Sequence, residues 1–232
     1  MSRELRENAT LCLWLFRRVL VASKDLLLTP TEYGDSGEAM VKKYADALHL
    51  LLSFCWKNSQ PRSIFYAIAG SQHRLWRLEN IRLLLGELRS KNLRQANEPD
   101  DKLESDDAES EWRELVLIRD EQLKFALKET RNLSDVLPDR SSVLEALTVL
   151  QYEIANDTIS GVAWIETLKA AYNKVSTHFG EALETVDEWF IPPYKVDWGP
   201  ESAAGEGLFG SVHFGKLQIQ MQIRNDDEQK SS

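Results

Sequence analysis

Apolar residues recur at three- and four-residue intervals along most of this sequence, a spacing typical of amphipathic α-helices. The spacing predicts helical segments over about residues 3–28, 37–57, 63–91, 111–133, 142–156 and 160–190. Gly70 interrupts the third segment and predicts a kink or a short break there. Helices with one apolar face bury those faces against one another. We therefore expect a mainly α fold, with a four-helix bundle over residues 1–135 and two connecting, brace-like helices over 139–190.

One segment between the expected helices differs in composition. NEPDDKLESDDAESE, residues 97–111, holds eight acidic residues in fifteen and almost nothing apolar. Such a segment buries too little apolar surface to offset the entropy that is lost when it becomes ordered. We expect an acidic loop or hinge over these residues.

The two connecting helices carry boundary signals. Ser142 and Glu145 have the spacing of a capping box, which predicts that the first of them begins there. Pro192 and Pro193 cannot continue a helix, and they also restrict the residue before them. We therefore expect the second connecting helix to end near Phe190.

The cysteines and histidines show no metal-site pattern. Cys12 and Cys55 each lie in an apolar helical run, with no second Cys or His at ligand spacing, so we expect two core thiols. The four histidines are scattered along the chain, at His49, His73, His178 and His213. We expect no metal site. The apolar stretch near the N-terminus is too short to cross a membrane, so we expect a cytoplasmic protein.

Charge is distributed unevenly along the chain. Residues 1–95 hold 15 Lys and Arg against 9 Asp and Glu, a net charge of +6, whereas residues 96–232 hold 13 against 28, a net charge of −15. A basic first half can approach an acidic membrane surface or an acidic protein partner. Its basic residues lack aromatic interleaving and a nucleic-acid reading motif, so we expect no nucleic-acid binding.

The apolar spacing becomes strand-like after the proline pair. GEGLFGSVHFGKL, residues 205–217, and QIQMQI, residues 218–223, favour branched and aromatic residues. We expect a short β-hairpin over residues 194–224 and a polar tail over 225–232. A dinucleotide-binding glycine motif leads into a helix, whereas here the chain continues as a strand.

The glycines of this segment match the pattern GxGxxGxV at Gly205, Gly207, Gly210 and Val212, with Phe209 before the third glycine. The segment resembles the glycine-rich loop of protein kinases. The stretch WFIPPYKVDW, residues 189–198, resembles the entry to the kinase domain of the tyrosine-kinase-like (TKL) group. The order of the segments carries a second resemblance. A basic helical bundle, two connecting helices and then a kinase start near residue 200 resemble the arrangement of mixed lineage kinase domain-like proteins.

The resemblance implies an ATP-dependent Ser/Thr protein kinase of signal transduction. ATP would lie against the backbone of Gly205, Gly207 and Gly210, with Phe209 and Val212 covering it. A kinase also needs a strand-three Lys, a helix-C Glu, a catalytic-loop Asp and Asn, and a metal-binding Asp. None of these can be placed here, because neither Arg224 nor Lys230 fits the position of the lysine.

We therefore expect that these 232 residues do not catalyse phosphotransfer. Half of a nucleotide pocket buries too little of a ligand to hold it, so we also expect little ATP binding by this chain alone. A two-stranded hairpin is marginally stable by itself and needs to dock on the helices. The resemblance implies a kinase truncated just after its glycine-rich loop.

Two functions from different classes remain open. The chain is either the N-terminal regulatory or interaction region of a TKL-like kinase, or a stand-alone, non-catalytic helical adaptor. In the second case the bundle would bind a partner helix or an acidic membrane surface. Trp14 and Phe16, next to Arg17 and Arg18, are the residues to examine for membrane contact, and a core role is the competing explanation for them.

Overall fold

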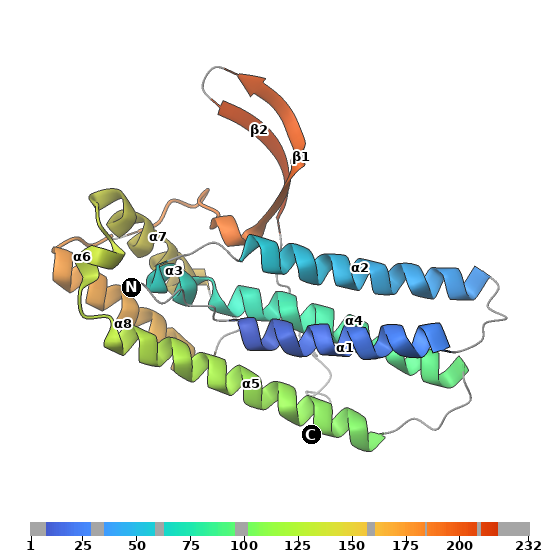
Figure 1. Ribbon diagram of the computed structural model, residues 1–232. Coiled ribbons are helices and arrows are strands. Elements are labelled where there is room, and N and C mark those ends of the chain that lie inside the picture. Colours follow the sequence, from blue (N-terminus) through green and yellow to red (C-terminus); the bar gives the residue numbers. More distant parts are fainter. Residues whose placement is uncertain are drawn as a thin grey trace, which may run out of the picture. The chain divides into compact units, whose positions relative to one another are not determined.

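A computed structural model of the protein describes residues 8–28, 35–58, 63–95, 102–156, 161–183, 185–207 and 210–217. The described chain is mainly helical, as expected (Figure 1). Its helices are α1 (Ala9–Leu28), α2 (Asp35–Lys57), α3 (Ile64–Ala69), α4 (Ser71–Gln95), α5 (Lys102–Glu129), α6 (Leu133–Val136), α7 (Arg140–Asn156) and α8 (Val162–Phe179). A 3-10 helix, η1 (Pro193–Lys195), precedes strands β1 (Val196–Gly207) and β2 (Gly210–Leu217).

The chain divides into two compact units. The first consists of Met1–Ile68 and Arg74–Pro138, and the second of Ala69–His73 and Asp139–Ser232.

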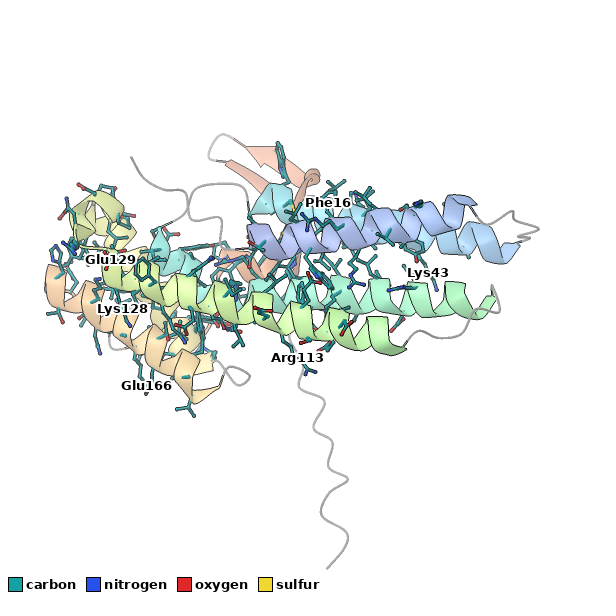
Figure 2. The ribbon with its side chains drawn as sticks, turned by 60° about the horizontal axis from the view of Figure 1, so that its bottom comes forward. Phe16, Lys43, Arg113, Lys128, Glu129 and Glu166 are labelled. Atoms are coloured by element: carbon teal, nitrogen blue, oxygen red, sulfur yellow. The ribbon has the colours of Figure 1, made fainter. Side chains whose placement is uncertain are left out.

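The long helices of the first unit share one core. It is formed by Leu11, Trp14, Leu15, Val19 and Ala22 of α1, Tyr44, Ala47, Leu51 and Phe54 of α2, Leu78, Ile81, Leu85 and Leu88 of α4, and Trp112 of α5. The rings of Trp14 and Trp112 lie 5.2 Å apart, centroid to centroid. Phe16, labelled on α1 in Figure 2, packs against the same cluster and is partly buried. Trp14 and Phe16 therefore belong to the core.

The break expected at Gly70 is confirmed. Gly70 forms a turn between α3 and α4. In the first unit, the buried guanidinium of Arg74 donates hydrogen bonds to the carbonyl of Ala67, at 2.5 Å, and to that of Tyr66, at 3.4 Å. The last carbonyls of a helix have no partner within the helix. Arg74 therefore provides a donor for two carbonyls at the end of α3.

The expected acidic loop is wrong for residues 102–111, because α5 begins at Lys102 and runs through them. The Glu109 carboxylate pairs with Arg82 of α4, Nη1 to Oε2 at 2.5 Å, and with Arg113 one turn later on α5, Nε to Oε1 at 3.0 Å. Acidic residues are also favourable in the first turns of a helix. The ion pair to α4 and the favourable placement of acidic residues near the helix start stabilise this helix, and the composition of the segment does not show either. Residues 97–101 lie outside the described residues.

The expected capping box at Ser142 and Glu145 is also wrong. Helix α7 begins at Arg140, and its cap is formed by Asp139 with Ser142. The Ser142 N–H donates to Asp139 Oδ1 at 2.7 Å, and the Ser142 hydroxyl donates to the Asp139 carbonyl at 2.7 Å. The carboxylate accepts more strongly than a hydroxyl would, so the helix begins two residues earlier than expected.

Helix α8 ends at Phe179, eleven residues before the end that the proline pair predicts. Gly180 has a φ of 68° and donates its N–H to the Ser176 carbonyl at 2.9 Å, which is a left-handed glycine C-cap. Leu183, expected on the helix, instead exchanges two hydrogen bonds with the Tyr172 hydroxyl, at 2.8 and 3.0 Å. The glycine, and not the prolines, stops this helix.

Candidate functional site

The glycines of the sequence motif lie at one end of an antiparallel strand pair. Val196 of β1 is opposite Leu217 of β2, and the ladder continues to Gly205 opposite Val212 and Gly207 opposite Gly210. The register shifts twice along the ladder, on either side of Ala203. Only Leu208 and Phe209 separate the last pair in the sequence, and both lie outside the described residues.

The strand pair therefore brings four of the five candidate residues together. Gly205, Gly207, Gly210 and Val212 occupy the last three paired positions of the ladder. Closely spaced glycines let a backbone approach phosphate oxygens without Cβ atoms in the way. Residues 218–232, which include the rest of the expected hairpin and the polar tail, lie outside the described residues.

A buried carboxylate holds the segment that leads into β1. Glu153 of α7 is 6% exposed, and its Oε1 accepts hydrogen bonds from the Tyr194 hydroxyl at 3.0 Å and from Lys195 Nζ at 2.9 Å. The Lys195 ammonium also lies 4.7 Å from the centre of the Tyr152 ring. A buried carboxylate with a cation and a hydroxyl on one oxygen is well compensated. The start of β1 is thereby fixed to α7.

The histidines do not gather at any site. His73 is buried, with its ring 6.1 Å from that of Tyr194, and His178 is exposed beside Phe179. His49 is exposed on α2, and His213 lies in β2 opposite Ala203. Among the residues that the structure describes, no three His, Cys, Asp or Glu side chains are grouped as a metal site would require.

Both cysteines pack, partly buried, against the core of the first unit, as expected. Burial, and then the neighbouring Cys55, raise the pKa of the Cys12 thiol above its ordinary value of 9.0. The reactive form of cysteine is the thiolate. Cys12 is therefore held in its unreactive, protonated form.

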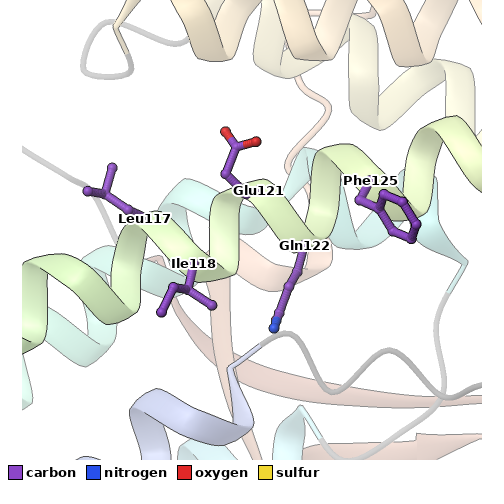
Figure 3. A pocket seen from close by; sticks show the side chains of 5 residues that line it. All are labelled: Leu117, Ile118, Glu121, Gln122 and Phe125. Carbon is purple, nitrogen blue, oxygen red and sulfur yellow. The ribbon is translucent and has the colours of Figure 1, made fainter.

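The outer face of α5 carries apolar side chains that the sequence analysis did not single out. Leu117, Ile118 and Phe125 are 66%, 44% and 65% exposed, and with Glu121 and Gln122 they line an open hollow of about 440 Å³ (Figure 3). The run Leu115-Val116-Leu117-Ile118 was the available signal, because four consecutive residues of a helix cannot all face one core.

Helix α1 also has an exposed face that is not part of the core. Leu13, Leu20 and Val21 are 54%, 65% and 52% exposed, and Arg17 and Lys24 are exposed beside them. This face combines apolar and basic side chains. None of the helices in the described ranges is long and apolar enough to cross a membrane.

No protein-family model matches this sequence, and no curated protein or solved structure is significantly similar to it. The site must therefore be interpreted from its own residues.

Proposed function

We propose that this chain is the N-terminal regulatory and interaction region of a TKL-like Ser/Thr protein kinase. In this proposal α1, α2, α4 and α5 form a four-helix bundle, α7 and α8 are the connecting helices, and β1 with β2 forms the opening hairpin of a kinase N-lobe. One observation carries the proposal. The glycines of GxGxxGxV fall at the end of an antiparallel strand pair, which is where a kinase places its glycine-rich loop.

The residues present suit a nucleotide loop. Gly205, Gly207 and Gly210 would leave backbone N–H groups accessible to phosphate oxygens, and Val212 would supply an apolar contact for the base. ATP, when bound, supplies the phosphoryl group for transfer. In the full-length product the glycine segment would bind and orient ATP, and Lys195, paired to Glu153, would help to fix the strand that carries the first glycine.

The activity of the chain itself is binding. The lysine, glutamate, asparagine and aspartates that kinase chemistry requires cannot be placed in its sequence, so phosphotransfer belongs to the full-length product. The helical part has ample surface for a protein partner. Five large apolar side chains at the surface of α1 and α5 are more than half exposed: Leu13, Leu20, Val21, Leu117 and Phe125.

The mass of the endogenous product tests the kinase assignment. The protein would be captured with an antibody against the helical region and analysed by intact-mass and peptide mass spectrometry. We expect a product heavier than 26.6 kDa, with peptides past Leu217 that include a lysine labelled by an acyl-phosphate derivative of ATP. A product of 26.6 kDa that the derivative does not label would contradict the assignment.

The second candidate function, a stand-alone adaptor, is favoured by the outer face of α1. This face carries the exposed apolar side chains of Leu13 and Leu20 next to the exposed cations Arg17 and Lys24. Such a combination suits contact with a partner helix or with an acidic membrane surface. Co-sedimentation with vesicles of phosphatidylserine and phosphatidylcholine tests the membrane version.

In that assay, Arg17→Glu with Lys24→Glu should abolish binding to acidic vesicles. The matched control changes two exposed cations elsewhere, Arg131→Glu with Lys169→Glu, and alters the net charge equally. Equal losses in the two double variants would show that only total charge matters, and would remove the support that α1 gives to the membrane version.

A further inference from the structure

The outer face of α5 carries a stripe of five residues that the core does not use. Glu111, Glu114, Ile118, Glu121 and Phe125 follow one another at intervals of three, four, three and four residues. This spacing keeps side chains on one face of a helix. All five residues are exposed. We refer to them as the α5 stripe.

The two apolar members of the α5 stripe line the same hollow. Ile118 and Phe125 line the hollow of about 440 Å³, together with Leu117, Glu121 and Gln122 (Figure 3). Single exposed apolar residues are ordinary on a protein surface, whereas here three of them, Leu117, Ile118 and Phe125, line one hollow. Ile118 and Phe125 are seven residues apart, which corresponds to about 10.5 Å along the helix axis. That is the separation of two anchor residues on a docked helix.

The charged members of the stripe are acidic. Among the described residues, neither Glu111 nor Glu114 forms an ion pair, while Glu121 binds Lys124 Nζ at 2.9 Å. Of the nearby cations, Arg113, labelled in Figure 2, is paired with Glu109 at 3.0 Å. Glu111 and Glu114, at the start of the stripe, therefore carry negative charge that no cation of the described residues pairs, whereas Glu121, which lines the hollow, is compensated by Lys124.

We propose that the α5 stripe docks a basic amphipathic helix of a protein partner. Apolar side chains of that helix, seven residues apart, would contact Ile118 and Phe125. Lys or Arg side chains of that helix would face Glu111 and Glu114, because charge complementarity across an interface selects the partner and suppresses acidic competitors. The inference rests on the proposed binding role of the helical part and gives the chemistry of the partner.

The experiment is a fluorescence-anisotropy titration of the full chain with two synthetic helical peptides. Both have 18 residues and the same apolar face of Leu, and the polar face is Lys in one and Glu in the other. We expect the Leu/Lys peptide to bind at least about 10-fold more tightly than the Leu/Glu peptide, with an affinity that falls as salt rises.

Variants assign the binding to the α5 stripe. Ile118→Ser with Phe125→Ser should lower the affinity for the Leu/Lys peptide by about 10-fold or more, because the double change removes both anchor contacts. Glu111→Gln with Glu114→Gln should weaken the binding of the Leu/Lys peptide and flatten its salt dependence. Leu83→Ser is the matched control, since Leu83 of α4 is 50% exposed and lies outside the stripe, and it should leave the affinity unchanged.

Three outcomes would overturn the inference. They are equal affinity for the two peptides, binding that neither α5 double variant weakens, and a chain that dimerises by itself until Ile118→Ser with Phe125→Ser makes it monomeric. In the last case the stripe would bind a second copy. Far-UV circular dichroism shows whether each variant is folded. A wrong kinase assignment would appear in the mass of the endogenous product, and it leaves this titration unaffected.

Discussion

Replacing Glu153 should destabilise the second unit more than any surface change, because its carboxylate is the shared partner of two side chains. Glu153 is 6% exposed and accepts hydrogen bonds from the Tyr194 hydroxyl at 3.0 Å and from Lys195 Nζ at 2.9 Å. Removing the carboxylate leaves the buried Tyr194 hydroxyl without this acceptor. It also leaves the Lys195 ammonium without its counter-ion.

The magnitude follows from the burial of the two donors. Removing one member of a fully buried ion pair costs about 3–5 kcal/mol, and a hydrogen bond to a charged group contributes about 1.5–3 kcal/mol. The Lys195 side chain is 19% exposed, so its ammonium can turn toward water and recover part of its hydration. We therefore expect Glu153→Ala to lower the free energy of unfolding by about 2–4 kcal/mol. Glu153→Gln keeps an acceptor for the Tyr194 hydroxyl, so it should lower the free energy of unfolding by about half as much as Glu153→Ala.

Urea unfolding followed by far-UV circular dichroism measures these losses, and a double-mutant cycle isolates the pair. Glu153→Ala, Lys195→Met and the double variant should give a coupling energy of about 1 kcal/mol or more. Lys169→Met is the control, because Lys169 pairs with Glu166 on the exposed surface of α8 and should change stability by less than about 0.5 kcal/mol. A coupling energy near zero, or a Glu153→Ala variant as stable as the parent, would refute the reasoning.

Three further predictions concern helix ends and the core. Gly180→Ala should lower the free energy of unfolding by about 1–2 kcal/mol, because Gly180 has a φ of 68°. Gly86→Ala inside α4 should instead raise it by about 0.5–1 kcal/mol, and thermal melting of both variants shows whether the two shifts have opposite signs. Because the pKa of Cys12 is raised in the folded chain, its contribution to stability is constant below pH 9.0 and falls above that pH, where only the unfolded thiol ionises. The urea midpoints at pH 7.5 and pH 10 should therefore differ more for the parent than for Cys12→Ala. Hydrogen bonds from Ser142 lower the pKa of Asp139 below 3.8, so the stability it contributes is present above that pH and is lost as pH falls through the lower value. An acid titration of helix content should show no such loss in Asp139→Asn.

The course of the main helices could be predicted from the sequence because apolar spacing reports the face that a helix buries. Leu15, Leu51 and Leu78 are fully buried at the positions that the spacing selects. Gly70 separates α3 from α4 where its backbone freedom predicted a break. These are local properties, and they need no knowledge of which helix contacts which.

The errors arose where a distant or a competing local interaction decides the structure. Residues 102–111 are helical because Glu109 has a partner, Arg82, on another helix, which composition cannot show. Gly180 ends α8 before the proline pair is reached, and both signals were visible in the sequence. Asp139 was likewise a better cap than Ser142, so the error there was one of ranking.

The candidate site was predictable only in part. The glycine spacing singled out Gly205, Gly207, Gly210 and Val212 as candidates, and their role stays a prediction; the structure shows that they lie at one end of the strand pair. The role of Glu153 was not predictable, because a glutamate within a helical pattern is normally solvated. The α5 stripe could not be predicted either, because the sequence does not show which side of α5 faces the core.

Hydrogen exchange at residues 205–212 tests the central claim most directly. The endogenous product, captured through its helical region, and the 232-residue chain would each be compared with and without magnesium and ATP. If the glycine segment is the nucleotide loop of a TKL-like kinase, ATP should slow exchange at Gly205, Gly207 and Gly210 in the endogenous product and leave the 232-residue chain unchanged. Exchange that ATP does not slow in the endogenous product would contradict the claim.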